Sequence, residues 1–124
     1  MKKVFSEEPL APEVIADFKA KHKGVFCISV PATDEPPVDD SGNELPVQML
    51  DGFFRRLTID EIGLAQRAST TNNLLDPVKS VLIMYNTSLI GGHPAFESDE
   101  EVKRAALEQF KTVIKARTAT IKKV

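Results

Sequence analysis

The chain has little of the chemistry on which small secreted proteins and many enzymes depend. Its 124 residues include one cysteine, two histidines and no tryptophan. A single cysteine cannot form an internal disulfide, which excludes a disulfide-stabilised scaffold. Cys27 lies in the apolar run of residues 25–28, with no cationic neighbour to lower its pKa. The sequence therefore predicts a small buried residue at this position and not a reactive thiol.

Long hydrophobic runs are also absent. The longest apolar-rich stretch, residues 78–90, includes Lys79, Ser80 and Asn86 and is shorter than the roughly 20 residues that a membrane-spanning helix needs. The two lysines that follow Met1 are not succeeded by the apolar segment of a secretory signal. We therefore expect a cytoplasmic protein that has no contact with a membrane.

No group of side chains has the spacing of a catalytic, metal or cofactor site. His22 and His93 are predicted at helix ends, where an imidazole is commonly solvated or caps the helix, and neither has the context of a thiol–imidazole pair with Cys27. Residues 39–44 are acidic but lack the ligand spacing of a calcium-binding loop, so they predict a turn. The glycine pair 91–92 is expected to end a helix instead of holding a phosphate. The sequence thus predicts no enzyme, no metal and no cofactor.

The first half of the chain predicts one helix and one β-hairpin. Residues 1–11 are expected to be flexible. Pro12 and the one-face apolar spacing that follows it predict a helix over residues 12–22. Residues 25–30 and 47–56 are two runs rich in β-branched and aromatic side chains, and they predict an antiparallel hairpin.

The two expected strands are separated by a long loop. Residues 31–46 contain four prolines and five acidic residues and show no helical period. In the second strand, Asp51 and Gly52 indicate a turn or a bulge. A two-stranded hairpin is marginally stable in water, so we expect it to pack on helices or on another chain.

Helical patterns dominate from residue 58 onward. Thr58 and Glu61 have the spacing of a capping box, which predicts a helix that ends near residue 69. Asp76 followed by Pro77 predicts the start of a second helix. Residues 98–101 repeat the capping-box spacing and predict the start of a long last helix.

These patterns predict a single α+β domain over residues 1–124. It has an N-terminal helix, an antiparallel β-hairpin with a long acidic loop, and a three-helix C-terminal bundle within residues 58–121. The middle helix of this bundle is apolar on most sides as far as Ile90, which predicts a central position. Residues 70–73 are expected to connect the first two of these helices.

Charge is segregated along the chain, although the net charge is only −2. Six acidic residues and no basic residue lie between Lys23 and Arg55, whereas five basic residues and no acid follow Glu108. A structural explanation is available, since cations stabilise helix C-termini and a charged loop is easily solvated. The alternative is a pair of complementary patches that bind a partner. Nucleic acid is the weaker partner class, because the isoelectric point is about 5.7 and no aromatics interleave the basic end.

Three parts of the chain together resemble a known family. Residues 24–30 (Gly-Val-Phe-Cys-Ile-Ser-Val), residues 52–58 (Gly-Phe-Phe-Arg-Arg-Leu-Thr) and a helical remainder ending in a lysine pair are similar to the small tail-assembly-chaperone-like proteins of tailed phages and prophages. The similarity covers roughly residues 23–123, and Leu57 stands where the family usually has proline. The resemblance implies a non-enzymatic protein that binds the tape-measure and tail-tube proteins during assembly and is absent from the finished particle. It implies no metal and no cofactor.

The sequence favours a protein-interaction factor, with a small regulatory or nucleic-acid-associated protein as the alternative. An aromatic side chain next to two arginines has the composition of an interface anchor. The candidate partner-binding residues are Phe54, Arg55, Arg56, Lys115, Arg117, Lys122 and Lys123. The alternative for Phe53 and Phe54 is that one side chain enters the core and the other covers a helix. Self-association through the hairpin edge is a further expectation.

Overall fold

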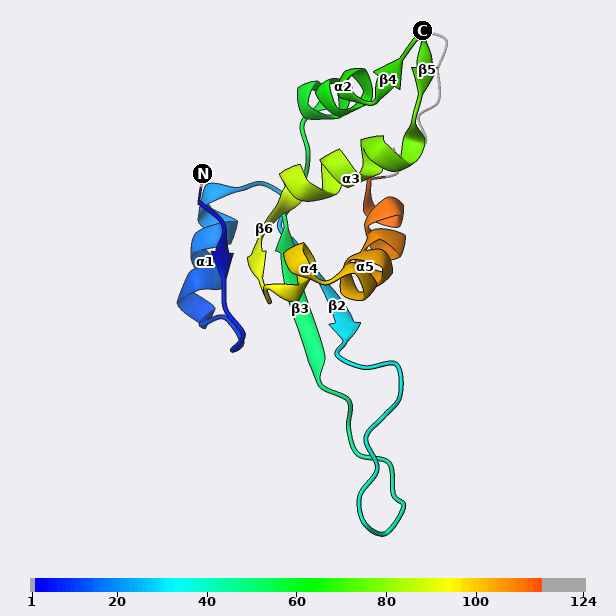
Figure 1. Ribbon diagram of the computed structural model, residues 1–124. Coiled ribbons are helices and arrows are strands. Elements are labelled where there is room, and N and C mark those ends of the chain that lie inside the picture. Colours follow the sequence, from blue (N-terminus) through cyan, green and yellow to red (C-terminus); the bar gives the residue numbers. More distant parts are fainter. Residues whose placement is uncertain (1, 115–124) are drawn as a thin grey trace, which may run out of the picture.

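The computed structural model describes residues 2–114 and has the mixed α+β fold that the sequence predicts (Figure 1). The helices are α1 (Pro12–Lys21), α2 (Ile59–Ala68), α3 (Pro77–Ser88), α4 (Ala95–Ser98) and α5 (Glu100–Val113). The strands are β1 (Val4–Phe5), β2 (Phe26–Pro31), β3 (Met49–Phe54), β4 (Thr70–Thr71), β5 (Leu74–Leu75) and β6 (Leu89–Gly92).

A four-stranded sheet forms the centre of the fold, in the order β1-β6-β3-β2. Strands β2 and β3 are antiparallel, with Phe26 opposite Phe54 and Pro31 opposite Met49. The predicted hairpin is therefore confirmed. Strand β6 pairs antiparallel with β3, and β1 pairs parallel with β6. One edge of the hairpin is thus covered by two further strands of the same chain.

The alternation of side chains across the sheet divides the core into two clusters. On one face, Phe53 of β3 and Ile90 of β6 pack with Phe18 of α1. Phe54 and Leu89 instead belong to the larger cluster, which includes side chains of α3, α4 and α5. The alternative interpretation of the two phenylalanines is therefore confirmed: Phe54 enters the main core and Phe53 covers a helix.

Strand β6 is the largest departure from the predicted fold. We expected a helix as far as Ile90 and a helix stop at the glycine pair, but α3 ends at Ser88 and the next four residues cross the sheet between β1 and β3. All four are buried, so the strand has no polar face to mark its period, and a short apolar run does not distinguish a strand from a buried helix. A three-helix bundle over residues 58–121 is therefore wrong, because β6 separates α3 from α5.

The irregularity that we expected at Asp51 and Gly52 lies further along the strand. Both residues lie inside β3, and the pairing with β6 shifts register between Phe53 and Phe54. A Cβ atom on Gly52 would lie 2.5 Å from Cδ2 of Phe96. The glycine therefore gives the Phe96 ring room to pack on the sheet.

Two segments that we expected to lack structure contain strands. The segment 1–11, predicted to be flexible, contains β1, in which Val4 lies opposite Gly91 of β6. Residues 70–73, predicted as a connector, begin the β4–β5 hairpin. Its two turn residues, Asn72 and Asn73, have φ values of 52° and 64°, the left-handed conformation that tight hairpin turns require.

Helix starts follow the predicted capping residues in two of three cases. The Thr58 hydroxyl accepts from the Glu61 N–H at 3.2 Å while the Glu61 carboxylate accepts from the Thr58 N–H at 2.9 Å, so the capping box is confirmed. Asp76 caps α3 as predicted, by accepting from the N–H of Lys79. The third prediction is wrong: α5 is capped by Asp99, because the short helix α4 extends through residue 98.

The loop of residues 32–48, which we call the acidic arm, projects from the sheet beyond the ends of β2 and β3 (Figure 1). Near its tip, Oδ1 of Asp39 accepts hydrogen bonds of 2.9 Å from the N–H groups of both Ser41 and Asn43. Nearly all of its side chains are exposed. The arm is thus held in shape by its own hydrogen bonds and not by the core.

Candidate functional site

Phe54 is unavailable to a partner, which corrects its place among the predicted binding residues. Its side chain is 0% exposed. The ring lies 5.2 Å from that of Tyr85, 5.5 Å from Phe26, 5.7 Å from Phe110 and 6.2 Å from Phe96, measured between centroids. The aromatic residue of the aromatic-arginine motif is therefore the centre of the core and not an exposed anchor.

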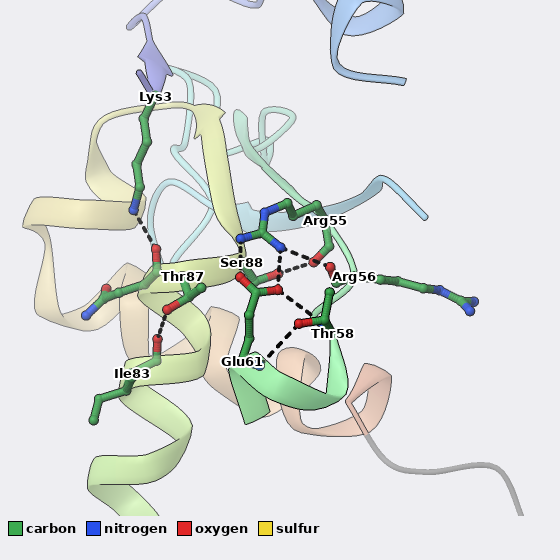
Figure 2. Close-up of polar contacts among 9 residues, drawn as sticks. Lys3, Arg55, Arg56, Thr58, Glu61, Ile83, Thr87 and Ser88 are labelled. Atoms are coloured by element: carbon green, nitrogen blue, oxygen red, sulfur yellow. Dashed lines mark hydrogen bonds and ion pairs between the residues drawn. The ribbon is translucent and has the colours of Figure 1, made fainter. Parts of the chain in front are cut away.

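Arg55, the next residue, forms a bidentate ion pair with Glu61 (Figure 2). Its two terminal nitrogens donate to the two carboxylate oxygens at 2.8 and 2.6 Å. Such paired hydrogen bonds between a guanidinium and a carboxylate are among the strongest in proteins. The hydrogen bonds from Arg55, and to a smaller degree those from Thr58, lower the pKa of Glu61 to about 2. The same pairing raises the pKa of Arg55.

The backbone of Arg55 fixes the junction between α3 and β6. Its N–H donates to the carbonyl of Ser88 at 2.9 Å, and the Ser88 hydroxyl donates back to the carbonyl of Arg55. Arg55 thus connects the end of β3 to the first turn of α2 through its side chain and to the end of α3 through its backbone. Its main role is to hold these three elements together.

We expect Glu61→Gln to lower the free energy of unfolding by about 1–2 kcal/mol at pH 7, with part of the pairing energy screened because about a quarter of the side chain is exposed. The folded-state pKa of about 2 lies below the ordinary 4.5, so the carboxylate stabilises the protein above pH 4.5 and loses this contribution as the pH falls towards 2. Urea unfolding of both proteins at several pH values tests this. A stability difference that persists unchanged at pH 2 would contradict it.

Among the predicted binding residues that the structure describes, Arg56 is the one that is exposed. Its side chain points away from the Arg55–Glu61 pair (Figure 2). It lies across Gly24, where an added Cβ atom would come within 2.4 Å of the Arg56 Cγ. The Arg56 N–H donates to the carbonyl of Lys23 at 3.3 Å, which brings two cationic residues next to each other.

An apolar groove of about 560 Å³ begins at these arginines. We call it the strand-end groove, because it lies where β2 starts and β3 ends. Its aliphatic lining consists of Leu57, Ile59, Ile62, Val113 and Ile114. Ile59 is 88% exposed although it is one of the largest aliphatic residues. The groove therefore combines uncovered apolar surface with a cationic end.

The basic residues at the end of the chain cannot be placed in this arrangement. Lys115, Arg117, Lys122 and Lys123 lie outside the described residues. Their role in binding therefore remains a prediction from the sequence.

Sequence reasoning missed a second apolar surface, which extends over α2, the β4–β5 hairpin and the start of α3. Its exposed large side chains are Leu64, Leu74, Leu75 and Val78, and Val78 is 69% exposed. Val78 also lines a groove of about 370 Å³ between α3 and α5, which we call the helical groove. The helical groove is lined further by Val81, Leu82 and Leu107 and has charged residues of α5 at its rim. The sequence does contain one signal for this surface: the leucine pair at residues 74 and 75 lies between two predicted helices and belongs to the apolar face of neither.

Two of the residues considered for catalysis, Cys27 and His93, make polar contacts with residues close to them in the sequence. Cys27 is exposed, not buried as predicted, and partial desolvation and the nearby Asp51 carboxylate raise its pKa. Nδ1 of His93 accepts from the N–H of Ala95 at the start of α4. Within residues 2–114, no three histidine, cysteine or acidic side chains are grouped as metal ligands would be.

Comparison with known proteins adds nothing to this geometry: no family model, no curated protein and no solved structure matches the chain. None of the described helices is both long enough and apolar enough to cross a membrane.

Proposed function

We propose that this protein is a non-enzymatic interaction factor, a phage or prophage tail assembly chaperone that binds the tape-measure or tail-tube protein. The observation that carries the proposal is the uncovered apolar surface of α2, β4–β5 and α3 next to the helical groove. Several large apolar side chains exposed on neighbouring elements beside a groove are typical of a protein-binding site. The resemblance of the β-hairpin segments to the tail-assembly-chaperone-like family supplies the class of partner.

The helical groove suits an amphipathic helix better than an extended peptide. Its floor is formed by aliphatic side chains of two helices, and its rim carries both acidic and basic residues, among them Glu100, Lys103 and Arg104. An amphipathic helix that lays its apolar side into such a groove places its own flanking charges at the rim. A tape-measure protein, which is long and helical, offers many segments of this kind.

The test is co-purification with the tape-measure and tail-tube proteins of the same genome, using wild type and Val78→Asp. Val78 is the second residue of α3, where an acidic side chain suits the helix dipole, so we expect the variant to fold normally. Its affinity for the partner should fall at least about tenfold, because a charge replaces apolar contact area in the groove.

The matched control is Val38→Asp, which makes the same change at an exposed valine of the acidic arm. This control should bind the partner as wild type does. Capture of neither tail protein by the wild type would overturn the proposal, and so would equal binding by wild type and Val78→Asp.

A further inference from the structure

We infer that this protein associates with further copies of itself, with the acidic arm of one copy seated in the strand-end groove of another. The inference is independent of the proposed function, because it uses neither the helical groove nor the apolar surface around it. It rests on the charge and apolar surface of two regions at opposite ends of the same hairpin.

The acidic arm combines negative charge with exposed apolar side chains, which match an apolar groove that has a cationic end. Residues 32–48 contain five acidic residues and no basic one. Near the tip, Val38 and Leu45 are exposed by 60% and 43%. The Asp39 carboxylate accepts hydrogen bonds from the backbone near this tip and orders it before binding. Because the tip is already ordered, the loss of conformational entropy on binding is smaller.

The strand-end groove offers the complementary surface. Ile59 and Val113 leave aliphatic area uncovered for the two apolar residues of the arm. Arg56 lines its cationic end, and the backbone N–H of Arg56 donates to the carbonyl of Lys23. The charge of Arg55 is already matched by Glu61, so among the described lining residues Arg56 is the cation that remains to bind an acidic group.

The first turn of α2, a helix whose Ile59 and Ile62 line the groove, carries two acids. Asp60 is the exposed acid of the first turn of α2, and Glu61 is held by Arg55. Opposite charges on arm and groove favour and orient their encounter.

The hairpin geometry prevents an arm from reaching the groove of its own chain. The groove lies at the Phe26–Phe54 end of the β2–β3 pair, whereas the arm leaves from the Pro31–Met49 end. Five steps along a strand separate the two ends by about 17 Å, and the arm projects away from the body (Figure 1). The occupant is therefore a second copy. Two copies that each seat the arm in the other's groove form a closed two-fold dimer, whereas single arm–groove contacts build a ring or an open chain of subunits.

The test measures molar mass by light scattering over a range of protein concentrations. The groove variant is Ile59→Asp, at the first residue of α2, and the arm variant is Val38→Asp. Both positions are exposed, and an acid in the first turn of a helix suits the dipole, so we expect both variants to fold. Arg56→Glu is a second groove variant. Val78→Asp is the matched control, since it places the same charge in the first turn of another helix.

We expect the mass of wild type and of Val78→Asp to rise with concentration, and to rise less as salt increases from about 0.1 M to about 1 M. Each groove or arm variant alone should associate at least about tenfold more weakly. A mixture of Ile59→Asp with Val38→Asp should form a one-to-one dimer and stop there, because the mixture has one intact arm and one intact groove. A wild type that stays monomeric, variants that associate as wild type does, or a mixture that stays monomeric would each overturn the inference.

Discussion

Replacing Phe54 by alanine is expected to lower the free energy of unfolding by about 3–5 kcal/mol. The ring is fully buried and contacts aromatic rings from β2, α3, α4 and α5. Its removal leaves a cavity at the point where these elements meet, and the neighbouring rings cannot all move inward to fill it. Urea unfolding followed by circular dichroism measures the loss.

The control for this variant is Met49→Ala at the other end of the same strand. Met49 is half exposed, so its truncation should change the free energy of unfolding by less than about 0.5 kcal/mol. The opposite pattern, a Phe54→Ala protein of wild-type stability that has lost partner binding, would mean that Phe54 is the exposed anchor that the sequence motif predicts.

The parts of the fold that the sequence predicts correctly depend on local chemistry. The capping box of Thr58 and Glu61 requires only neighbouring residues, and the same holds for the cap formed by Asp76. The pairing of β2 with β3 follows from two similar runs that are adjacent along the chain. Each of these features is specified within a few residues or by one loop.

The parts that could not be predicted depend on contacts between distant residues. Strand β6 is buried on both faces, so its four residues show neither a helical nor a strand period. Strand β1 has only two residues and exists because β6 is there to pair with it. Because β6 cannot be recognised from the sequence, the sequence predicts a hairpin and helices and not a four-stranded sheet.

The candidate site shows the same division. The motif of an aromatic residue followed by Arg55 and Arg56 does mark one end of a groove. The motif cannot say that the aromatic residue is buried or that Arg55 is engaged by Glu61, because both facts arise from how β3 meets α2. Only Arg56 is left facing outward. The exposed leucines of the β4–β5 hairpin follow a turn at residues 72 and 73, which the sequence predicts only as part of a connector.

The glycine pair 91–92, which resembles a helix stop in the sequence, is expected to be among the positions least tolerant of substitution. Gly92 has a φ of +119°, a conformation nearly restricted to glycine. A Cβ atom there would lie 2.3 Å from the carbonyl oxygen of Asp51 on the paired strand β3. Gly92→Ala therefore combines backbone strain with a collision against main chain that cannot rotate away. We expect a loss of about 3 kcal/mol or more in the free energy of unfolding.

Two other glycines separate the two causes of this loss. Gly42 in the acidic arm has a φ of +82° and nothing within 4 Å of an added Cβ, so Gly42→Ala should show the strain alone, about 1 kcal/mol. Gly63 lies in α2 with an ordinary helical φ and only the Arg67 guanidinium nearby, at 3.5 Å, so Gly63→Ala should stabilise the protein by about 0.5–1 kcal/mol. If residue 92 ended a helix exposed to solvent, Gly92→Ala would behave like Gly42→Ala. A loss well beyond that of Gly42→Ala is the result expected of a strand position pressed against its neighbour.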